Sequence, residues 1–279
     1  MNKRKGINRL TELEFNKLGK FIYSQFGIKM PKNKRVMLES RLQKRLRQLD
    51  MKSFTTYIKY LFSDDGMQFE LETMLNLVTT NKTDFFRESD HFEHMVKHAI
   101  PDLLHNGQKN VKIWSAGCST GEEAYTTAMM LENFIEKYHN FDYKIYCTDL
   151  STDVIKVAKK GVYPLERINV VPQAFKKRYM LRSKDKSKKL IRMKSFIRKK
   201  LVFKRLNFMD LDYEMKTKFD IIFFRNVMIY FDKKTQNHVV NGLCKYLKDK
   251  SIFYLGHSET LNGLDVPLKM IIPTIYRRM

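Results

Sequence analysis

The stretch Trp114-Ser-Ala-Gly-Cys-Ser-Thr-Gly-Glu-Glu123 is the most informative part of this sequence. A short apolar run, Val111–Trp114, precedes it, and an apolar-periodic run from Ala124 to Phe134 follows it. This order predicts a strand, a turn of small residues and the start of a helix. Such a turn lets the backbone approach a ligand closely and presents helix N–H groups to it.

A second strand-like run, Tyr143–Thr148, ends at Asp149, 26 residues after Glu123. An acid at the end of the strand that follows a small-residue turn is typical of nucleoside-binding α/β units, where it bonds the ribose hydroxyls. The turn alone has a second interpretation. Thr120-Gly-Glu-Glu123 fits a capping box, in which Glu123 bonds backbone N–H and touches no ligand.

Composition sets the class of protein. The chain has 279 residues, 43% of them hydrophobic and 30% charged, which is typical of a folded soluble protein. No apolar run approaches the roughly 18–20 residues that span a bilayer. The basic N-terminus has no apolar core behind it, so we expect no export.

The three cysteines form no CxxC pair, which favours a reducing cytoplasm. His91 and His94 are three residues apart, but the sequence shows no third or fourth metal ligand near them. A solvated helix face is therefore favoured over a zinc site, and no metal is predicted.

The net charge of +23 is unevenly distributed. Residues 1–50 carry 14 Lys and Arg against 4 Asp and Glu, and residues 182–205 carry 12 against 1. Two basic segments of this kind indicate an acidic partner, which charge alone leaves open among nucleic acid, an anionic membrane and an acidic protein. A basic but unpartnered soluble surface is the alternative.

Two parts of the chain differ in their periodicity. We predict a small all-α domain over residues 1–78, with a helical pattern from residue 11 onward. It has a capping box at Thr11–Glu14, a basic second helix, a third helix capped by Ser53 and a fourth from about Met67 to Val78. The outer face of the second helix carries Arg35, Arg41, Lys44, Arg45 and Arg47.

From residue 79 to 279, strands alternate with helices, which predicts an α/β domain with a doubly wound, mostly parallel sheet. The expected strands are Val111–Trp114, Tyr143–Cys147, Leu201–Phe203, Ile221–Phe224 and Ile252–Leu255, with Pro273–Tyr276 as an antiparallel edge strand. Helices are expected at Asp153–Lys160 and Lys234–Leu247. A basic insertion at about 164–200 interrupts the alternation, and a strand subdomain and a pair of helices both fit it.

Ligands of open α/β sheets bind at the carboxyl ends of the strands. Those ends predict a site made of Ala116 with Gly117, Asp149, Asn207, and Arg225 with Asn226. The segment from Asn207 to Asp210 offers an amide and an apolar face for an adenine ring. A buried strand that ends in Arg-Asn favours function over packing, although a capped helix is the alternative.

The motifs NKTDFFRE, WSAGCSTGEEAY, CTDLS, FFRNVMIYFD and LGHSETL occur in this order. Together they resemble the CheR-type chemotaxis receptor methyltransferases, a family that uses S-adenosylmethionine to methylate glutamate side chains of chemoreceptors. The resemblance covers nearly the whole chain and implies a Rossmann-like class I methyltransferase domain behind the helical domain. It implies a cytoplasmic bacterial enzyme of chemotaxis signalling, with S-adenosylhomocysteine as its product.

The resemblance also implies a role for each matched residue. The implied cofactor contacts are Asn81, Thr83, Arg87, Glu123, Asp149, Asn207, Phe208, Arg225 and Asn226. Glu122 is one position from Glu123 and is the alternative at that place. Arg87 and Tyr230 match the pair that faces the substrate glutamate.

Partners are implied in the same way. The basic second helix matches the surface that meets the acidic methylation helices of the receptor. The insertion matches a subdomain that docks a receptor C-terminal peptide in some members, but its loop 181–189 lacks their glycines, so peptide docking is not expected.

Two rival functions follow from other features. The basic surfaces favour a nucleic-acid methyltransferase. However, amino-methylating enzymes share an Asp/Asn-Pro-Pro-aromatic motif where this chain has Arg225-Asn-Val-Met228, so nucleic acid is not the expected partner. A non-catalytic cofactor sensor is the second rival, and the full set of Arg87, Asp149, Asn226 and Tyr230 argues against it.

Overall fold

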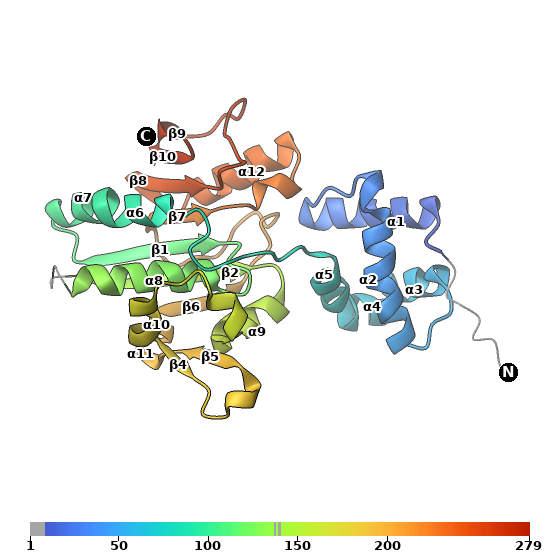
Figure 1. Ribbon diagram of the computed structural model, residues 1–279. Coiled ribbons are helices and arrows are strands. Elements are labelled where there is room, and N and C mark those ends of the chain that lie inside the picture. The colour runs from blue at the N-terminus through green and yellow to red at the C-terminus, as the bar shows by residue number, and fades with distance from the viewer. Residues whose placement is uncertain (1–8, 137, 139–140) are drawn as a thin grey trace. The chain divides into compact units, whose positions relative to one another are not determined.

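The computed structural model describes residues 9–136, 138 and 141–279 (Figure 1). The chain divides into two compact units, residues 1–80 with 230–232, and residues 81–229 with 233–279. The predicted division after residue 78 falls two residues before the end of the first stretch. Lys3, Arg4 and Lys5, which contribute to the basic N-terminal segment, lie outside the described residues.

The first unit is helical. Its elements are α1 (Glu12–Phe26), η1 (Lys32–Lys34), α2 (Arg35–Gln48), α3 (Phe54–Leu61), α4 (Asp64–Phe69) and α5 (Leu71–Val78). The capping box at Thr11 and Glu14 is confirmed, and so is the Ser53 cap of α3. The single fourth helix predicted from Met67 to Val78 is wrong, because the helical turns of α4 and α5 separate at Glu70.

The basic face of α2 is only partly a surface. Arg45 pairs with the buried Glu70 at 2.6 Å, and Tyr57 donates to the same carboxylate at 2.9 Å. Arg41 donates to the carbonyls of residues 77, 78 and 79, which end α5. The prediction that all five basic side chains face outward is therefore wrong. Arg35, Lys44 and Arg47 remain exposed.

The second unit is built on a seven-stranded sheet of order β6-β2-β1-β7-β8-β10-β9. Its strands are β1 (Asn110–Ala116), β2 (Asp142–Asp149), β6 (Leu201–Arg205), β7 (Phe219–Phe224), β8 (Leu247–Leu255), β9 (Leu268–Ile272) and β10 (Ile275–Arg278). The first five pair in parallel, and β10 is antiparallel to both neighbours. The predicted doubly wound sheet is confirmed.

Two boundaries of this sheet differ from the prediction. Residues 273–276 do not form the edge strand, because β10 lies between β8 and β9 and the edge is β9. The helix expected at Lys234–Leu247 ends at Cys244, since Leu247 already pairs with Phe219 as the first residue of β8.

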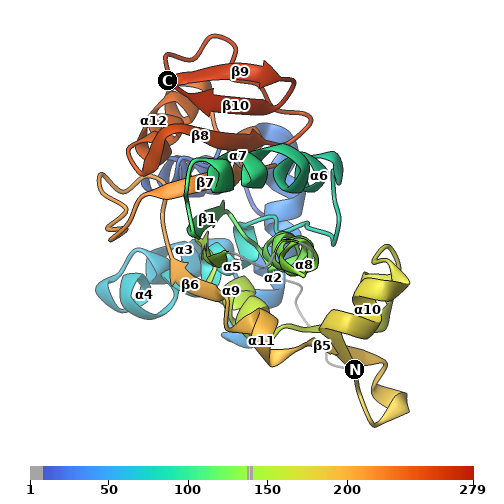
Figure 2. The same ribbon diagram turned by 90° about the vertical axis from the view of Figure 1, so that its left-hand side faces the viewer.

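Helices cover both faces of the sheet. They are α6 (Asp90–His94), η2 (Met95–Ala99), α7 (Ile100–His105), α8 (Glu122–Ile135), α9 (Thr152–Lys160) and α12 (Lys233–Cys244), with the short turn η5 (Met228–Tyr230) before the last. Figure 2 shows α6, α7 and α8 on one face and α12 on the other. Burial on both faces explains why β7 is apolar at five of six positions and buried at all of them.

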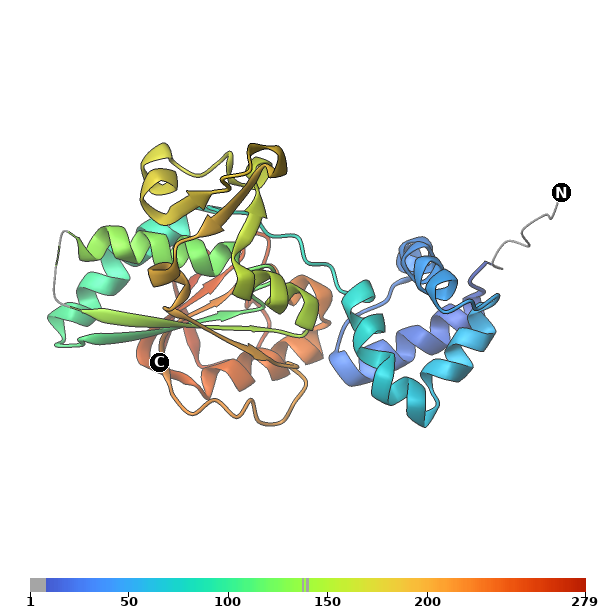
Figure 3. The ribbon, with the colours of Figure 1, turned by 90° about the horizontal axis from the view of Figure 1, so that it is seen from below.

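The insertion forms a small antiparallel sheet of order β3-β5-β4. Its elements are β3 (Val162–Pro164), η3 (Leu165–Ile168), α10 (Gln173–Tyr179), β4 (Met180–Arg182), η4 (Lys186–Lys188), β5 (Leu190–Met193) and α11 (Ser195–Arg198). Figure 3 shows this sheet, in olive and yellow, as a layer separate from the large sheet. Of the two interpretations left open, the strand subdomain is therefore correct.

Candidate active site

The small-residue turn after β1 is held against β2. Gly117 and Cys118 donate their backbone N–H groups to the carbonyl of Thr148 at 2.8 and 2.9 Å. Gly117 has φ +85°, and a Cβ there would lie 2.5 Å from Cγ2 of Val227. Both the backbone conformation and the close approach of the segment after β7 therefore require glycine at this position.

The capping box predicted for Thr120 and Glu123 is wrong. Helix α8 begins at Glu122, and its N-cap is Gly121 in the left-handed region, with no side-chain cap bond. Thr120 lies outside the helix and its hydroxyl donates to Glu122 Oε2 at 2.6 Å. Glu123 consequently has no capping role, and its Oε1 accepts from the Ser115 hydroxyl at 2.7 Å.

The two adjacent glutamates face different partners. Glu122 is buried and pairs with Arg167 of η3 at 2.6 Å. Glu123 lies 3.6 Å from Arg225 Nη1. Burial raises the pKa of Glu123, and the Arg225 charge opposes that rise. Glu123 therefore shares its surroundings with the residues at the end of β7, whereas Glu122 joins α8 to the inserted subdomain.

Asp149 ends β2 and is 9% exposed. Its Oδ2 accepts from Ser119 N at 2.9 Å and its Oδ1 from Ser151 N at 3.0 Å. Burial raises the pKa of its carboxyl, and these backbone donors counteract the rise. A carboxylate has about four lone-pair sites, so two backbone bonds leave room for further hydroxyl donors.

Arg225 directly follows β7 and is only 6% exposed. It donates to Glu88 Oε2 at 3.0 Å and to the carbonyl of Arg87, and its guanidinium lies 5.1 Å from the ring centre of Phe92. Among the described residues, its Nη1 has no hydrogen-bond partner. Asn226 follows with φ +60° and donates Nδ2 to Glu88 Oε1 at 3.2 Å.

The segment Asn81–Glu88 bonds to several parts of this unit. Ser119 Oγ donates to the carbonyl of Asn81 at 2.9 Å, and Arg167 donates to that of Thr83. Arg87 donates to the carbonyl of Lys82 at 3.2 Å, and its Nε lies 3.8 Å from Glu88. Phe86 and Glu88 both adopt positive φ, so the segment turns sharply just where Arg87 lies.

Asn207 and Phe208 have local roles. Asn207 Oδ1 accepts from Met209 N at 3.1 Å. Phe208 is buried, with its ring 5.2 Å from that of Phe224 and 6.0 Å from that of Tyr213. The aromatic ring is therefore used in packing. Ala116, the last residue of β1, is buried as well.

Tyr230 belongs to the helical unit. Its carbonyl accepts from Lys29 N at 2.9 Å, Lys34 Nζ lies 5.3 Å from its ring centre, and its hydroxyl lies 3.5 Å from the carbonyl of Thr80. Arg87 belongs to the other unit. The pairing of Arg87 with Tyr230 stays a prediction.

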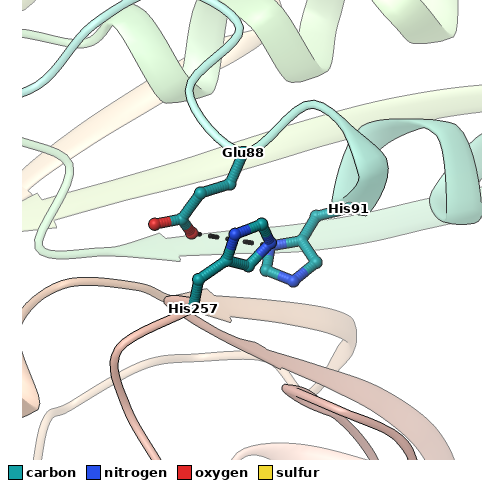
Figure 4. Close-up of side chains that lie close together, drawn as sticks. All are labelled: Glu88, His91 and His257. Atoms are coloured by element: carbon teal, nitrogen blue, oxygen red, sulfur yellow. Dashed lines mark ion pairs between the residues drawn. The ribbon is translucent and has the colours of Figure 1, made fainter.

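His91 does not lie on the solvated helix face that its spacing suggested. It is fully buried, and Figure 4 shows it converging with Glu88 and His257. The ligand atoms of these three side chains lie within 4.8 Å of one another. However, Glu88 Oε2, which is 3.9 Å from His91 Nδ1, already accepts from Arg225. A guanidinium on the same oxygen opposes a cation, so we interpret the cluster as a polar contact around the buried His91.

The buried His91 predicts a dependence of stability on pH. Burial, followed by the charge of Arg225, lowers the pKa of His91 from 6.5 to about 4, while Asp90 and Glu88 act in the opposite direction. Between these two pH values the unfolded chain binds a proton that the folded chain does not. The free energy of unfolding should therefore fall as the pH is lowered from 6.5 to 4.

This expectation is checked by urea unfolding of the wild type and of His91→Asn across that pH range. The decline should be shallower in His91→Asn, whereas His98→Asn, at an exposed position of the same helical stretch, should keep the wild-type decline. Equal slopes in all three proteins would contradict the assignment to His91.

The sequence interpretation missed three side chains. Glu88 binds Arg225 and Asn226, Arg167 binds Glu122, and Glu259 accepts from the backbone N–H of Asn226. Glu88 and Glu259 lie inside two of the quoted motifs, NKTDFFRE and LGHSETL, which is the signal that was available. Arg167 lies in the basic insertion, and nothing in the sequence distinguishes it from the other basic residues there.

Family models divide the chain in two. Residues 13–79 match the model described as CheR methyltransferase, all-alpha domain, and residues 81–276 match CheR methyltransferase, SAM binding domain. The chain belongs to the CheR methyltransferase family. The family confirms the predicted enzyme class, an S-adenosylmethionine-dependent methyltransferase, and its cofactor.

Curated relatives in this family align over almost their whole length. A chemotaxis protein methyltransferase of Borreliella burgdorferi is 40% identical over 96% of this chain and 95% of its own. Chemotaxis protein methyltransferase 2 of Pseudomonas aeruginosa is 35% identical over 95% and 93%. The Escherichia coli chemotaxis protein methyltransferase is 33% identical over 96% and 91%. In the described part of this chain, no helix is long and apolar enough to cross a membrane.

Proposed function

We propose that this CheR-family methyltransferase methylates glutamate side chains in the cytoplasmic, acidic helical region of chemoreceptors. Bound S-adenosylmethionine supplies an activated methyl group, and its transfer to a carboxylate gives a methyl ester and S-adenosylhomocysteine. The observation that carries the proposal is that, in a CheR-family chain, Glu88 joins Arg87, Arg225 and Asn226, and Arg225 also faces Glu123.

The side chains at the strand ends fit the cofactor. S-adenosylmethionine presents hydroxyls, an amino-acid carboxylate and positive charge. Asp149 retains acceptor capacity for hydroxyls. Arg225 has a buried Nη1 without a hydrogen-bond partner among the described residues, which suits an anionic group. Glu123 supplies a carboxylate, on a side chain that is 15% exposed, 3.6 Å from this Nη1. Glu122 is already paired with Arg167, so Glu123 is the better candidate for the contact.

The acceptor sets modest chemical demands. A glutamate is ionised near pH 7, so the chain needs no general base to produce the nucleophile. The task left to the protein is to bind and orient the carboxylate and to exclude water from it. Arg87 is suited to that task because its side chain is 35% exposed and within reach of an incoming group. We assign Tyr230 the role of a hydrogen-bond donor to the same carboxylate.

Charge supports the acidic receptor region as the substrate. Helix α2 exposes three basic side chains, those of Arg35, Lys44 and Arg47. Its other two, Arg41 and Arg45, make a hydrogen bond and an ion pair within the helical unit. Exposed basic side chains on one helix attract acidic helices and raise the rate of encounter. A cytoplasmic location follows from this choice of substrate.

Incubation with methyl-labelled S-adenosylmethionine and cytoplasmic chemoreceptor fragments tests the proposal. We expect label in the fragment that is released as methanol by mild base, which marks a carboxyl methyl ester. A fragment whose candidate glutamates are replaced by alanine should take up no label. Label that resists base, or that enters RNA and no fragment, would contradict the proposal.

A further inference from the structure

Glu259 is a buried carboxylate just beyond the carboxyl end of β8, and the proposed function leaves it without a role. It is 7% exposed. Its Oε2 accepts from Asn226 N at 2.7 Å and from Gly256 N at 2.8 Å, and its Oε1 lies 3.3 Å from the donor Ile229 N. A buried charge is costly unless it is hydrogen-bonded, and these three donors are all backbone N–H groups.

These bonds join two neighbouring strand ends. Strands β7 and β8 pair in parallel up to Phe224 and Leu255, and the chain then leaves the sheet at Arg225 and Gly256. Glu259 reaches from the β8 side to two amides of the segment that follows β7. The path of that segment is therefore set by a side chain of the neighbouring loop and not by strand pairing.

The backbone held in this way is strained. Asn226 has φ +60°, a conformation that is unfavourable for a non-glycine residue and persists where the surroundings enforce it. Gly256 packs against it so closely that a Cβ would lie 2.4 Å from Asn226 Nδ2 and 2.9 Å from Asn226 N. Glu88 holds the side-chain amide of Asn226 from another direction.

We propose that Glu259 is a positioning residue for methyl transfer. It holds the backbone of Asn226 in the left-handed conformation and so orients Arg225 and Asn226 toward the cofactor. It also accepts from the backbone N–H of Ile229, farther along the segment that follows β7. The inference rests on the proposed function, because it assumes that Arg225 and Asn226 contact S-adenosylmethionine.

Burial raises the pKa of Glu259, and the backbone donors from residues 226, 228, 229 and 256 counteract the rise. A carboxylate accepts at both oxygens, whereas a glutamine presents two N–H donors in place of one acceptor. Glu259→Gln therefore keeps the size of the side chain. Its NH₂ group, a donor, would face one of the backbone N–H groups, which is also a donor, so that hydrogen bond is lost.

The test uses the full chain with S-adenosylhomocysteine as the calorimetric probe and chemoreceptor fragment as the methyl acceptor. We expect Glu259→Gln to raise the dissociation constant about five- to tenfold, less than the loss of a direct hydrogen bond to a charged group, because Glu259 acts on the cofactor only through the backbone of Asn226. We also expect kcat to fall while KM for the receptor fragment changes little. Gly256→Ala should give the same pattern, because it displaces Asn226 and leaves the charge of Glu259 in place.

Glu70→Gln is the matched control. Glu70 is also a buried carboxylate, and its partners, Arg45 and Tyr57, lie in the helical unit. Its substitution should lower the melting temperature and leave cofactor binding unchanged. A purely structural Glu259 would behave in the same way, so a wild-type dissociation constant and kcat in Glu259→Gln and Gly256→Ala would overturn the inference. A wild-type protein that binds no S-adenosylhomocysteine would instead contradict the proposed function.

Discussion

Arg87→Ala should lower kcat/KM for methyl transfer to a chemoreceptor fragment by about ten- to hundredfold. The reason is the loss of a hydrogen bond to a charged group, which contributes about 1.5–3 kcal/mol. Folding should be unaffected. The side chain is 35% exposed, its Nε is 3.8 Å from Glu88, and such partly exposed pairs contribute about 0–1 kcal/mol.

Steady-state kinetics with labelled cofactor measure this effect, with the melting temperature as the check on folding. Arg87→Lys keeps the positive charge but lacks the planar fork, so we expect an intermediate rate. Arg277→Ala is the matched control. Arg277 lies on strand β10, has a similarly exposed side chain, and pairs with Asp102 of α7 at 3.8 Å. Wild-type turnover in Arg87→Ala would remove Arg87 from the active site.

Asp149→Ala should weaken S-adenosylhomocysteine binding by about ten- to hundredfold, on the same physical basis. Two losses combine in this variant. The ribose hydroxyls lose their acceptor, and Ser119 and Ser151 lose the acceptor of their backbone N–H groups, so the turn after β1 loosens. Isothermal titration calorimetry of the purified full chain measures the dissociation constant.

Asp149→Asn separates the two losses. Its single carbonyl oxygen can keep one backbone bond, so we expect binding between that of the wild type and that of Asp149→Ala. The matched control is Asp153 of α9, an exposed carboxylate that pairs with Lys156 on the surface of the same helix. Asp153→Ala should bind as the wild type does. An unchanged constant in Asp149→Ala would place the ribose contact elsewhere.

The strands and most of the helices could be predicted because their signals are local. The apolar run of β7 and the helical spacing of α9 with its Gly161 end were both readable from neighbouring residues. The failures were local ambiguities as well. The helices α4 and α5 were predicted as one because the break between them, at Glu70, carries no glycine or proline. The edge strand β9 was not predicted because its residues lack a clear alternation of polar and apolar side chains.

The candidate site was predictable as a set of strand ends but not as a network. Asp149, Arg225 and Asn226 lie at strand ends where a parallel sheet gathers polar groups. Their bonds join residues distant in sequence: Arg225 and Glu88 are separated by 137 positions, and Asn226 and Glu259 by 33. Periodicity carries no information on such pairs.

The sequence by itself determined the order of strands and helices, the motifs of the CheR family and the positions where a site was to be expected. Only the tertiary structure decided which carboxylate meets which donor. It placed Glu123 beside Arg225 and Glu122 beside Arg167, although the two glutamates are adjacent and chemically identical. The physical reason is that successive helical residues point about 100° apart, so their partners are chosen by what packs on each side of α8.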